Sequence, residues 1–151
     1  MELMLVIAIT GFVIIMAPSI LAGLNRKGVR HAAEHLYSEL QLARLSAIRS
    51  KKPCALVFNT PSPNQYFNSL TKKHVDLGQY RGGVRFLPTG PDGKSMAHEI
   101  RFNRQGMSMS LAPVHAYLTN KDGSPIYRLR VMLPGGLSME RWNGETWRTH
   151  G

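Results

Sequence analysis

Residues 3–24 read LMLVIAITGFVIIMAPSILAGL and contain no charged side chain. A helix needs about 20 such residues to cross the hydrocarbon core of a bilayer, so this segment predicts a transmembrane helix. The apolar run is too long for a secretory signal peptide, and the charge before it, Glu2, is acidic rather than basic. A carboxylate at the edge of the span and Pro18 within it favour a helix packed among other helices over one alone in lipid.

The sequence after this segment continues as an amphipathic helix. Apolar residues recur in steps of four, three, four, three and four, which is the heptad spacing of a buried helix face. They are Val29, Ala33, Leu36, Leu40, Ala43 and Ala47. Gly23 and Gly28 weaken the junction between the two halves, and Pro53 ends the pattern. We therefore expect one helix from about residue 2 to about residue 51, with its second half packed on a following domain.

From Cys54 onward, short β-rich runs alternate with Pro, Gly, Asn and Asp. The expected strands are Ala55–Asn59, Gln65–Leu70, His74–Leu77, Val84–Leu87, Glu99–Asn103, Met107–Leu111, His115–Thr119, Ile126–Leu133, Leu137–Trp142 and Glu145–Arg148. Many short strands at this spacing are typical of an antiparallel domain in two sheets. The sequence thus predicts an α+β fold, in which the long helix packs on a small two-sheet β domain. The expected divisions are 1–24 for the hydrophobic helix, 25–52 for its amphipathic continuation and 53–151 for the β domain.

The last hairpin is predicted from Asn143-Gly144, the preferred pair for a type I′ turn. A two-residue loop places Trp142 opposite Glu145 and Glu140 opposite Trp147, so both tryptophans share one face of the hairpin. Such a pair can be a stacking platform for nucleic-acid bases. Aromatic pairs also commonly stabilise hairpins, and we favour that structural interpretation.

The composition favours a folded, basic protein. The 151 residues contain 19 Lys and Arg against nine Asp and Glu, and the formal net charge is +10. That excess points to nucleic acid or anionic lipid as partners. Hydrophobic residues make up 43% of the chain and charged residues 19%, which argues against general disorder. Cys54 is the single cysteine, which excludes an internal disulfide and a cysteine-based zinc site.

One motif of a metalloprotease occurs on the amphipathic helix. His31, Glu34 and His35 spell H-x-x-E-H, the inverted zincin pattern, in which two histidines bind zinc and the glutamate is the base. Helices contain many chance matches to so short a motif, and no acidic ligand stands out downstream. The sequence also contains no nucleophile elbow, P-loop or paired-carboxylate pattern. We expect no catalytic residue, no metal and no cofactor, in a protein that is not an enzyme.

The opening MELMLVIAITGFVIIMAPSI closely resembles the N-terminus of type IV pilins and type II secretion pseudopilins. That family begins its mature chain with Phe-Thr-Leu-[Ile/Met]-Glu-Leu. Met1-Glu2-Leu3 resembles the last part of this motif, and Ala8-Ile9-Thr10-Gly11 resembles the Ala-Ile-x-Gly that follows. Leu40–Ile48 resembles the Leu-x-x-Ala-Arg-x-x-Ala-Ile helix end of the GspH/FimT branch, and Ile100–Gly106 resembles its central strand-and-glycine segment. We expect the first residues of the family motif to lie upstream of Met1.

The resemblance implies a minor pseudopilin of the GspH/FimT family, a structural component of a type II secretion pseudopilus or a type IV pilus. It implies processing by a prepilin peptidase, N-methylation, a single span in the bacterial inner membrane and a pilin-like periplasmic domain. Arg26, Lys27 and Arg30, which by the positive-inside rule favour a cytoplasmic C-terminal side, would then lie in the periplasm. Glu2 would meet the N-terminal amine of a neighbouring subunit, and other pilins in the filament are the expected partners.

A second function, of a different class, is DNA binding by a minor pilin in natural transformation. Arg128, Arg130, Arg141 and Arg148 lie near the C-terminus and are the candidates to contact phosphates. FimT-type DNA binders resemble one another in a Gly-Arg-x-Arg segment, and the matching place here, Gly135–Met139, contains neither arginine. We therefore expect DNA binding that is weak and independent of sequence, and pseudopilus assembly in protein secretion as the main function.

Overall fold

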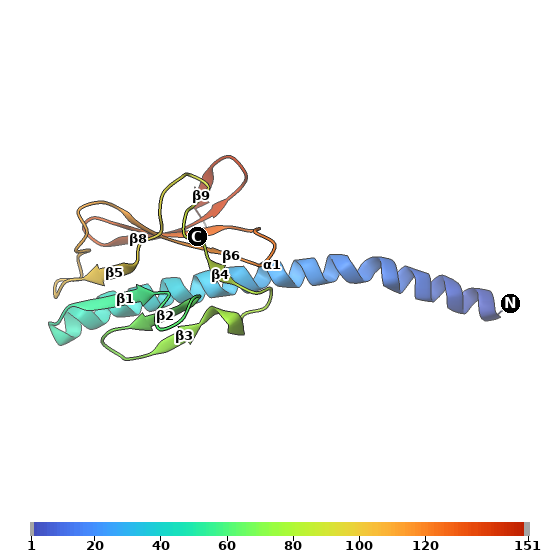
Figure 1. Ribbon diagram of the computed structural model, residues 1–151, viewed down its shortest axis with the longest axis horizontal. Helices are drawn as coiled ribbons and strands as arrows, with labels where there is room; N and C mark the ends of the chain where they lie inside the picture. The colour runs from blue at the N-terminus through green and yellow to red at the C-terminus, as the bar shows by residue number, and fades with distance from the viewer. Residues whose placement is uncertain (1, 150–151) are drawn as a thin grey trace.

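One long helix runs the length of the molecule (Figure 1). The computed structural model describes the backbone of residues 2–149 and the side chains of residues 23–149. Helix α1, Glu2–Ser50, extends far beyond the β-strands, and only its C-terminal half lies against them. The expected single helix is confirmed, and it ends three residues before Pro53.

The C-terminal half of α1 buries the predicted apolar face. The six side chains of the heptad face are fully buried, and they are Val29, Ala33, Leu36, Leu40, Ala43 and Ala47. Ala32 widens this face, as expected for a helix that packs on a broad surface rather than on one partner helix. Because α1 contacts strands of both sheets, the helix and the two sheets share one hydrophobic core.

The first sheet has four strands in the order β3-β2-β1-β5, and all neighbouring strands are antiparallel. These strands are β1 Cys54–Phe58, β2 Gln65–Asn68, β3 His74–Asp76 and β5 Glu99–Phe102. A short 3-10 helix, η1 Leu77–Gln79, follows β3. Successive residues of a strand face opposite sides, so alternate side chains such as Leu56, Ile100 and Phe102 reach the core beneath α1.

The second sheet has five antiparallel strands in the order β4-β6-β7-β8-β9. They are β4 Arg85–Phe86, β6 Val114–Thr119, β7 Tyr127–Met132, β8 Gly136–Trp142 and β9 Trp147–Thr149. The inner face contributes aliphatic side chains to the core, among them Leu118, Leu129 and Val131. The alternate residues of the same strands form an outer face, on which the arginines Arg128 and Arg130 lie.

The predicted strand Met107–Leu111 is wrong. Residues 107–111 form no strand, and only an isolated bridge joins Ser108 to Phe102. The Asn103 side chain accepts hydrogen bonds from the backbone N–H groups of Gln105 and Met107, at 2.9 and 3.0 Å. Such local side-chain bonds compete with strand pairing, so the apolar alternation of this segment is not used in a sheet. The other nine expected strands are present, with bounds shifted by one or two residues.

The predicted register of the last hairpin is also wrong. Trp142 stands directly opposite Trp147, and Arg141 stands opposite Arg148. The loop therefore has four residues, because the Asn143 side chain accepts hydrogen bonds from the N–H groups of Glu145 and Thr146 and closes a wider turn. Both tryptophans still share one face, as predicted, with ring centroids 5.1 Å apart.

Among the side chains that the structure describes, no helical stretch is long and apolar enough to cross a membrane. The predicted span, residues 3–24, lies outside those side chains except for its last two residues. The transmembrane character of this segment therefore stays a prediction of the sequence.

Candidate functional site

Two residues of the H-x-x-E-H motif of α1, Glu34 and His35, have protein partners, and His31 is exposed. Arg30 Nε donates a hydrogen bond to Glu34 Oε1 at 2.7 Å. His35 Nδ1 lies 3.0 Å from the hydroxyl of Tyr66 and 2.9 Å from that of Tyr80. Within residues 23–149, no three His, Cys, Asp or Glu side chains gather in a way that could hold a metal ion. Of the motif, His35 thus belongs to the packing between α1 and the first sheet, whereas Glu34 pairs with Arg30 within α1.

Arg128 is the centre of a buried ion-pair cluster on the outer face of the second sheet. Its side chain is 7% exposed and donates hydrogen bonds to Asp92 Oδ2 at 2.7 Å and to Glu140 Oε2. The ring of Trp147 lies over the guanidinium, 4.1 Å from Cζ to the ring centroid. Asp92 comes from the loop between β4 and β5, so the cluster attaches that loop to the sheet. Arg128 therefore has its charge balanced inside the protein.

The cluster shifts the pKa of the groups around it. Burial alone would raise the pKa of Asp92, but a hydrogen bond from the Tyr117 hydroxyl and the charge of Arg128 outweigh burial and hold that pKa below its usual value. Burial, together with the hydrogen bond to Asp92, raises the pKa of Tyr117 to about 12. Burial and the charge of Arg128 lower the pKa of His115. The folded state thus favours a charged Asp92 and a neutral His115.

The four candidate arginines lie on two different faces. Arg128 and Arg130 are on the outer face, and Arg130, half-buried, stands opposite His115. Its Nε is buried and has no hydrogen-bond partner among the described residues. Arg141 and Arg148 are exposed cross-strand neighbours on the face toward α1. The structure therefore brings the second pair together and separates it from the first pair.

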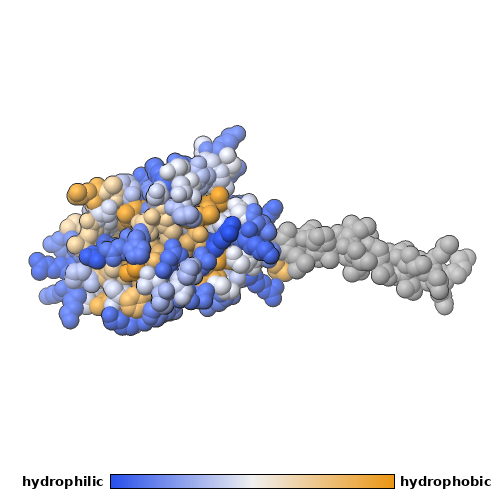
Figure 2. Space-filling view, in the orientation of Figure 1, coloured by the Kyte–Doolittle hydropathy of each residue, from blue (hydrophilic) through white to orange (hydrophobic). Residues whose placement is uncertain are grey.

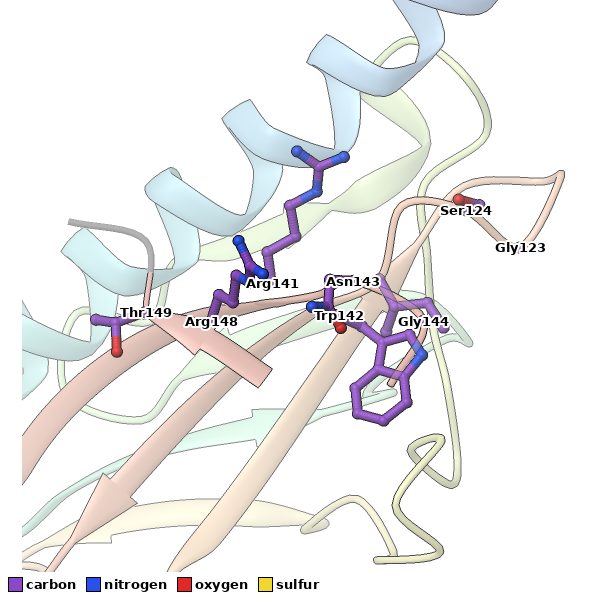
Figure 3. A pocket seen from close by; sticks show the side chains of 9 residues that line it. Gly123, Ser124, Arg141, Trp142, Asn143, Gly144, Arg148 and Thr149 are labelled. Atoms are coloured by element: carbon purple, nitrogen blue, oxygen red, sulfur yellow. The ribbon is translucent and has the colours of Figure 1, made fainter. Parts of the chain in front are cut away.

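Arg141 and Arg148 line a hollow beside the last hairpin (Figure 3). Figure 3 shows both arginine side chains on the helix side of the strands, whereas the Trp142 ring extends to the other side. Residues 123 and 124, from the loop between β6 and β7, form the opposite wall. This hollow presents positive charge without a facing carboxylate among its lining residues.

An exposed apolar stripe runs along α1 outside its buried face, and Leu45 and Ile48 line a groove there with Leu137 of β8. Leu42, Leu45 and Ile48 recur every three residues, and their exposed fractions are 53%, 54% and 42%. At the same end of the molecule, Met107 and Leu133 are also exposed, and Figure 2 shows hydrophobic colour at the end farthest from the N-terminal part of α1. An apolar patch of this kind marks an interaction site.

The heptad pattern does not reveal this stripe, because that pattern marks only the helix face that fits the β domain. The signal was present as Leu-x-x-Leu-x-x-Ile within residues 42–48. Glu2, the residue expected to act in subunit assembly, belongs to α1, but its side chain lies outside the described residues. Its role is therefore still a prediction.

Two solved structures have a similar architecture. One is the type IV minor pilin FimU of Pseudomonas aeruginosa, with a TM-score of 0.57 and 13% sequence identity over 82% of this chain and 94% of that chain. The other is the minor pseudopilin EpsH of the type 2 secretion system of Vibrio cholerae, with a TM-score of 0.53 and 14% identity over 74% of this chain and 94% of that chain. No protein-family model and no curated protein matches the sequence. At these identities the two similarities show the fold, which is pilin-like.

Proposed function

We propose that this chain, which has the fold of minor pilins and minor pseudopilins, is itself a minor pseudopilin of the GspH/FimT type. It would be a structural subunit of a type II secretion pseudopilus or a type IV pilus, with a role in filament assembly and protein secretion. In this proposal residues 1–24 anchor the chain in the bacterial inner membrane and later enter the filament core. Residues 53–151 form the periplasmic domain, and residues 25–52 connect the two.

The observation that carries the proposal is the division of α1. Its C-terminal half is buried against two sheets, whereas its N-terminal half continues as a helix beyond the strands (Figure 1). The sequence of that half is uncharged from Leu3 to Leu24. Apolar surface of this extent is unfavourable in water, so the segment needs either lipid or the apolar helices of other subunits around it. A membrane-stored filament subunit uses both environments in turn.

The exposed stripe supports contact with neighbouring subunits. Leu42, Leu45 and Ile48 continue the apolar character of α1 outside its buried face, and this chain covers only about half of each side chain. In a filament with α1 at the centre, this side faces the helices or domains of adjacent subunits. Burial of such side chains contributes favourable free energy to assembly.

In this proposal Glu2 sets the position of each subunit along the filament relative to its neighbour. A carboxylate among apolar helices needs a positively charged partner, and the N-terminal amine of an adjacent subunit would provide one. We expect Glu2→Ala to reach the membrane at the wild-type level and to be lost from sheared filaments, as measured by fractionation and immunoblotting. Glu34→Ala is the matched control, because Glu34 lies on an exposed part of the same helix and, among the described side chains, forms an ion pair with Arg30 alone.

Two results would contradict the proposal. One is the incorporation of Glu2→Ala into filaments as efficiently as the wild type. The other is a wild-type chain that fractionates with neither membranes nor filaments. Prepilin processing and N-methylation belong to the same proposal, and mass spectrometry of the filament-borne chain tests them.

DNA binding in natural transformation is the second candidate function. The observation that favours it is the exposed pair Arg141 and Arg148, whose positive charges are adjacent on β8 and β9. The buried pairing of Arg128 argues against a larger site, since its charge is already balanced by Asp92 and Glu140.

A further inference from the structure

The loop of residues 81–83 packs directly on α1 where the helix leaves the β domain. A Cβ on Gly28 would lie 2.0 Å from the carbonyl oxygen of Arg81, so only glycine permits this approach. On the other side, Gly82 lies against Asn25. The backbone N–H of Lys121 donates to the Gly82 carbonyl at 3.0 Å, which places the loop between β6 and β7 at the same point.

The β8–β9 hairpin reaches the same end of the domain. Arg141 stands opposite Tyr127 in the strand register. Burial raises the pKa of Tyr127, and the nearby charges of Arg141 and Arg30 oppose that rise, so both arginines lie close to it. The hollow that Arg141 and Arg148 line also includes residues 123 and 124, two and three positions after Lys121.

These contacts gather exposed basic side chains around the base of the β domain, and we call them the basic collar. Its members are Arg26, Lys27, Arg81, Lys121, Arg141 and Arg148. None of the six makes an ion pair among the described residues. Arg30, a neighbouring arginine on α1, is left out of the collar because it pairs with Glu34. The carboxylates nearest in sequence, Asp122 and Glu145, are too few to balance the collar.

The collar lies immediately after the uncharged segment of α1. Arg26 and Lys27 follow Leu24 by two and three residues, which is about 3–5 Å along a helix. Figure 2 shows hydrophilic side chains around the point where α1 leaves the domain. If residues 3–24 occupy a bilayer, Arg26 and Lys27 are therefore at the level of the lipid headgroups. Electrostatic attraction to a charged bilayer acts within about 8 Å at physiological ionic strength, so this level is where it is effective.

We propose that the basic collar binds the headgroups of anionic phospholipids in the bilayer that holds the apolar segment. The inference rests on the proposed membrane anchor. Binding at two or more points around α1 holds the β domain in one orientation on the membrane while the subunit is stored there. The observations favour lipid over nucleic acid because Arg26 and Lys27 directly follow the apolar segment, and the loops of Arg81 and Lys121 meet at α1 residues 25–28. An inserted helix brings a bilayer surface to this point of the chain.

The test uses the full chain in nanodiscs of phosphatidylcholine alone or with about 30% phosphatidylglycerol, a fraction chosen to give the bilayer a strongly negative surface. The two tryptophans of the chain, Trp142 and Trp147, are both in the hairpin that carries Arg141 and Arg148. Quenching of their fluorescence by a headgroup-labelled lipid reports how close this hairpin lies to the membrane. We expect stronger quenching in discs with phosphatidylglycerol, and we expect the difference to disappear at high salt.

Two charge-neutralised variants test the two parts of the collar, the hairpin and the helix, one at a time. Arg141→Gln with Arg148→Gln removes the hairpin charges, and Arg26→Gln with Lys27→Gln removes the helix charges without touching the hairpin. Both should lose the lipid-dependent part of the quenching. The matched control, Arg49→Gln with Arg104→Gln, removes two exposed arginines at the other end of the domain and should keep it.

The outcomes separate the two proposals. A wild-type chain that does not stay in discs of either composition overturns the membrane anchor, and the collar inference with it. A chain that stays embedded but is quenched equally in both lipids overturns the collar inference alone. Equal loss in the control and collar variants also overturns it, because the effect would then be one of net charge. Release of the quenching by a short DNA duplex at about 0.15 M salt would assign the collar to nucleic acid instead.

Discussion

Arg128 illustrates how a basic residue near the C-terminus is used inside the protein. Its sequence neighbourhood is compatible with phosphate binding, but Asp92 and Glu140 take up its charge and Trp147 covers it. The alternation of side chains along a strand puts Arg128 and Arg130 on the same face of β7, and in the structure both lie on its outer face. This alternation could not predict that Arg128 is buried in an ion pair, because its partner Asp92 lies 36 positions away in a loop without a periodic pattern.

Replacing Arg128 should therefore destabilise the fold. Arg128→Met leaves two carboxylates half-desolvated without their partner, and we expect a loss of about 3–5 kcal/mol in the free energy of unfolding. Urea unfolding of the full chain in mild detergent, followed by circular dichroism, measures it. Arg141→Met is the control, because Arg141 is exposed and unpaired by any carboxylate in the described chain. Equal stability of the two variants would mean that the cluster contributes little.

His115 should make the stability depend on pH. Since its pKa is lowered in the folded state, the unfolded chain binds more protons just below the usual value of about 6.5. Stability therefore falls as the pH decreases through the window between that value and the lowered pKa. Asp92 acts at more acidic pH, because a carboxylate with a lowered pKa loses its contribution only as the pH falls below about 4.

The variant His115→Gln tests this reasoning. It removes the titrating group while it keeps a polar side chain of moderate size, so the wild type should lose more stability than the variant between pH 7 and pH 5. Thermal unfolding at a series of pH values provides the comparison. Parallel curves for both proteins in that range would show that His115 titrates normally.

At the scale of elements, local patterns predicted most of the secondary structure. The heptad face of α1 and nine strands follow from periodicity and turn residues, which depend on near neighbours. The two errors have one physical cause, since Asn103 and Asn143 each use a side-chain oxygen to accept backbone hydrogen bonds. Periodicity in the sequence does not show this competition between side chain and backbone for hydrogen bonds. The competition replaced one expected strand by a turn and shifted the register of one hairpin.

Two leucines of α1 distinguish folding from assembly. Leu36 is fully buried, so Leu36→Asp places an unpaired charge in the core and should cost on the order of 4 kcal/mol of stability. Leu45 is 54% exposed, so Leu45→Asp should leave unfolding unchanged and reduce incorporation into filaments. Thermal unfolding and filament fractionation of both variants are the measurements. Wild-type stability of Leu36→Asp, or normal incorporation of Leu45→Asp, would refute the corresponding assignment.

At the scale of the molecule, the sequence predicted the charge but could not predict its distribution. The net charge of +10 is visible in the composition, whereas the collar combines α1, the 81–83 loop, the β6–β7 loop and the last hairpin. Only the tertiary fold brings these four segments together. The same holds for the apolar stripe, since its exposure depends on which face of α1 the sheets cover.

The distribution of charge predicts weak, salt-sensitive DNA binding. Two adjacent arginines give few phosphate contacts, so binding of the full chain to a duplex should be detectable at about 50 mM salt and largely lost at about 0.15 M. Arg141→Ala with Arg148→Ala should lower the slope of log K against log salt by about 2. Fluorescence anisotropy with a labelled duplex measures both. Micromolar binding of the wild type at about 0.15 M salt, lost in the double variant, would instead favour a role in DNA uptake.

The close contact at Gly28 fixes an angle as well as a distance. Because the 81–83 loop packs closely on α1 at residues 25–28, the β domain cannot rotate about the helix axis independently of α1. The helix has 49 residues and is about 74 Å long, and each residue is rotated by about 100° about the helix axis relative to the one before it. The number of residues between Glu2 and Gly28 therefore sets the azimuth at which the domain projects from a filament. A single inserted residue in that interval would leave every side-chain contact of the domain intact and point it in a different direction.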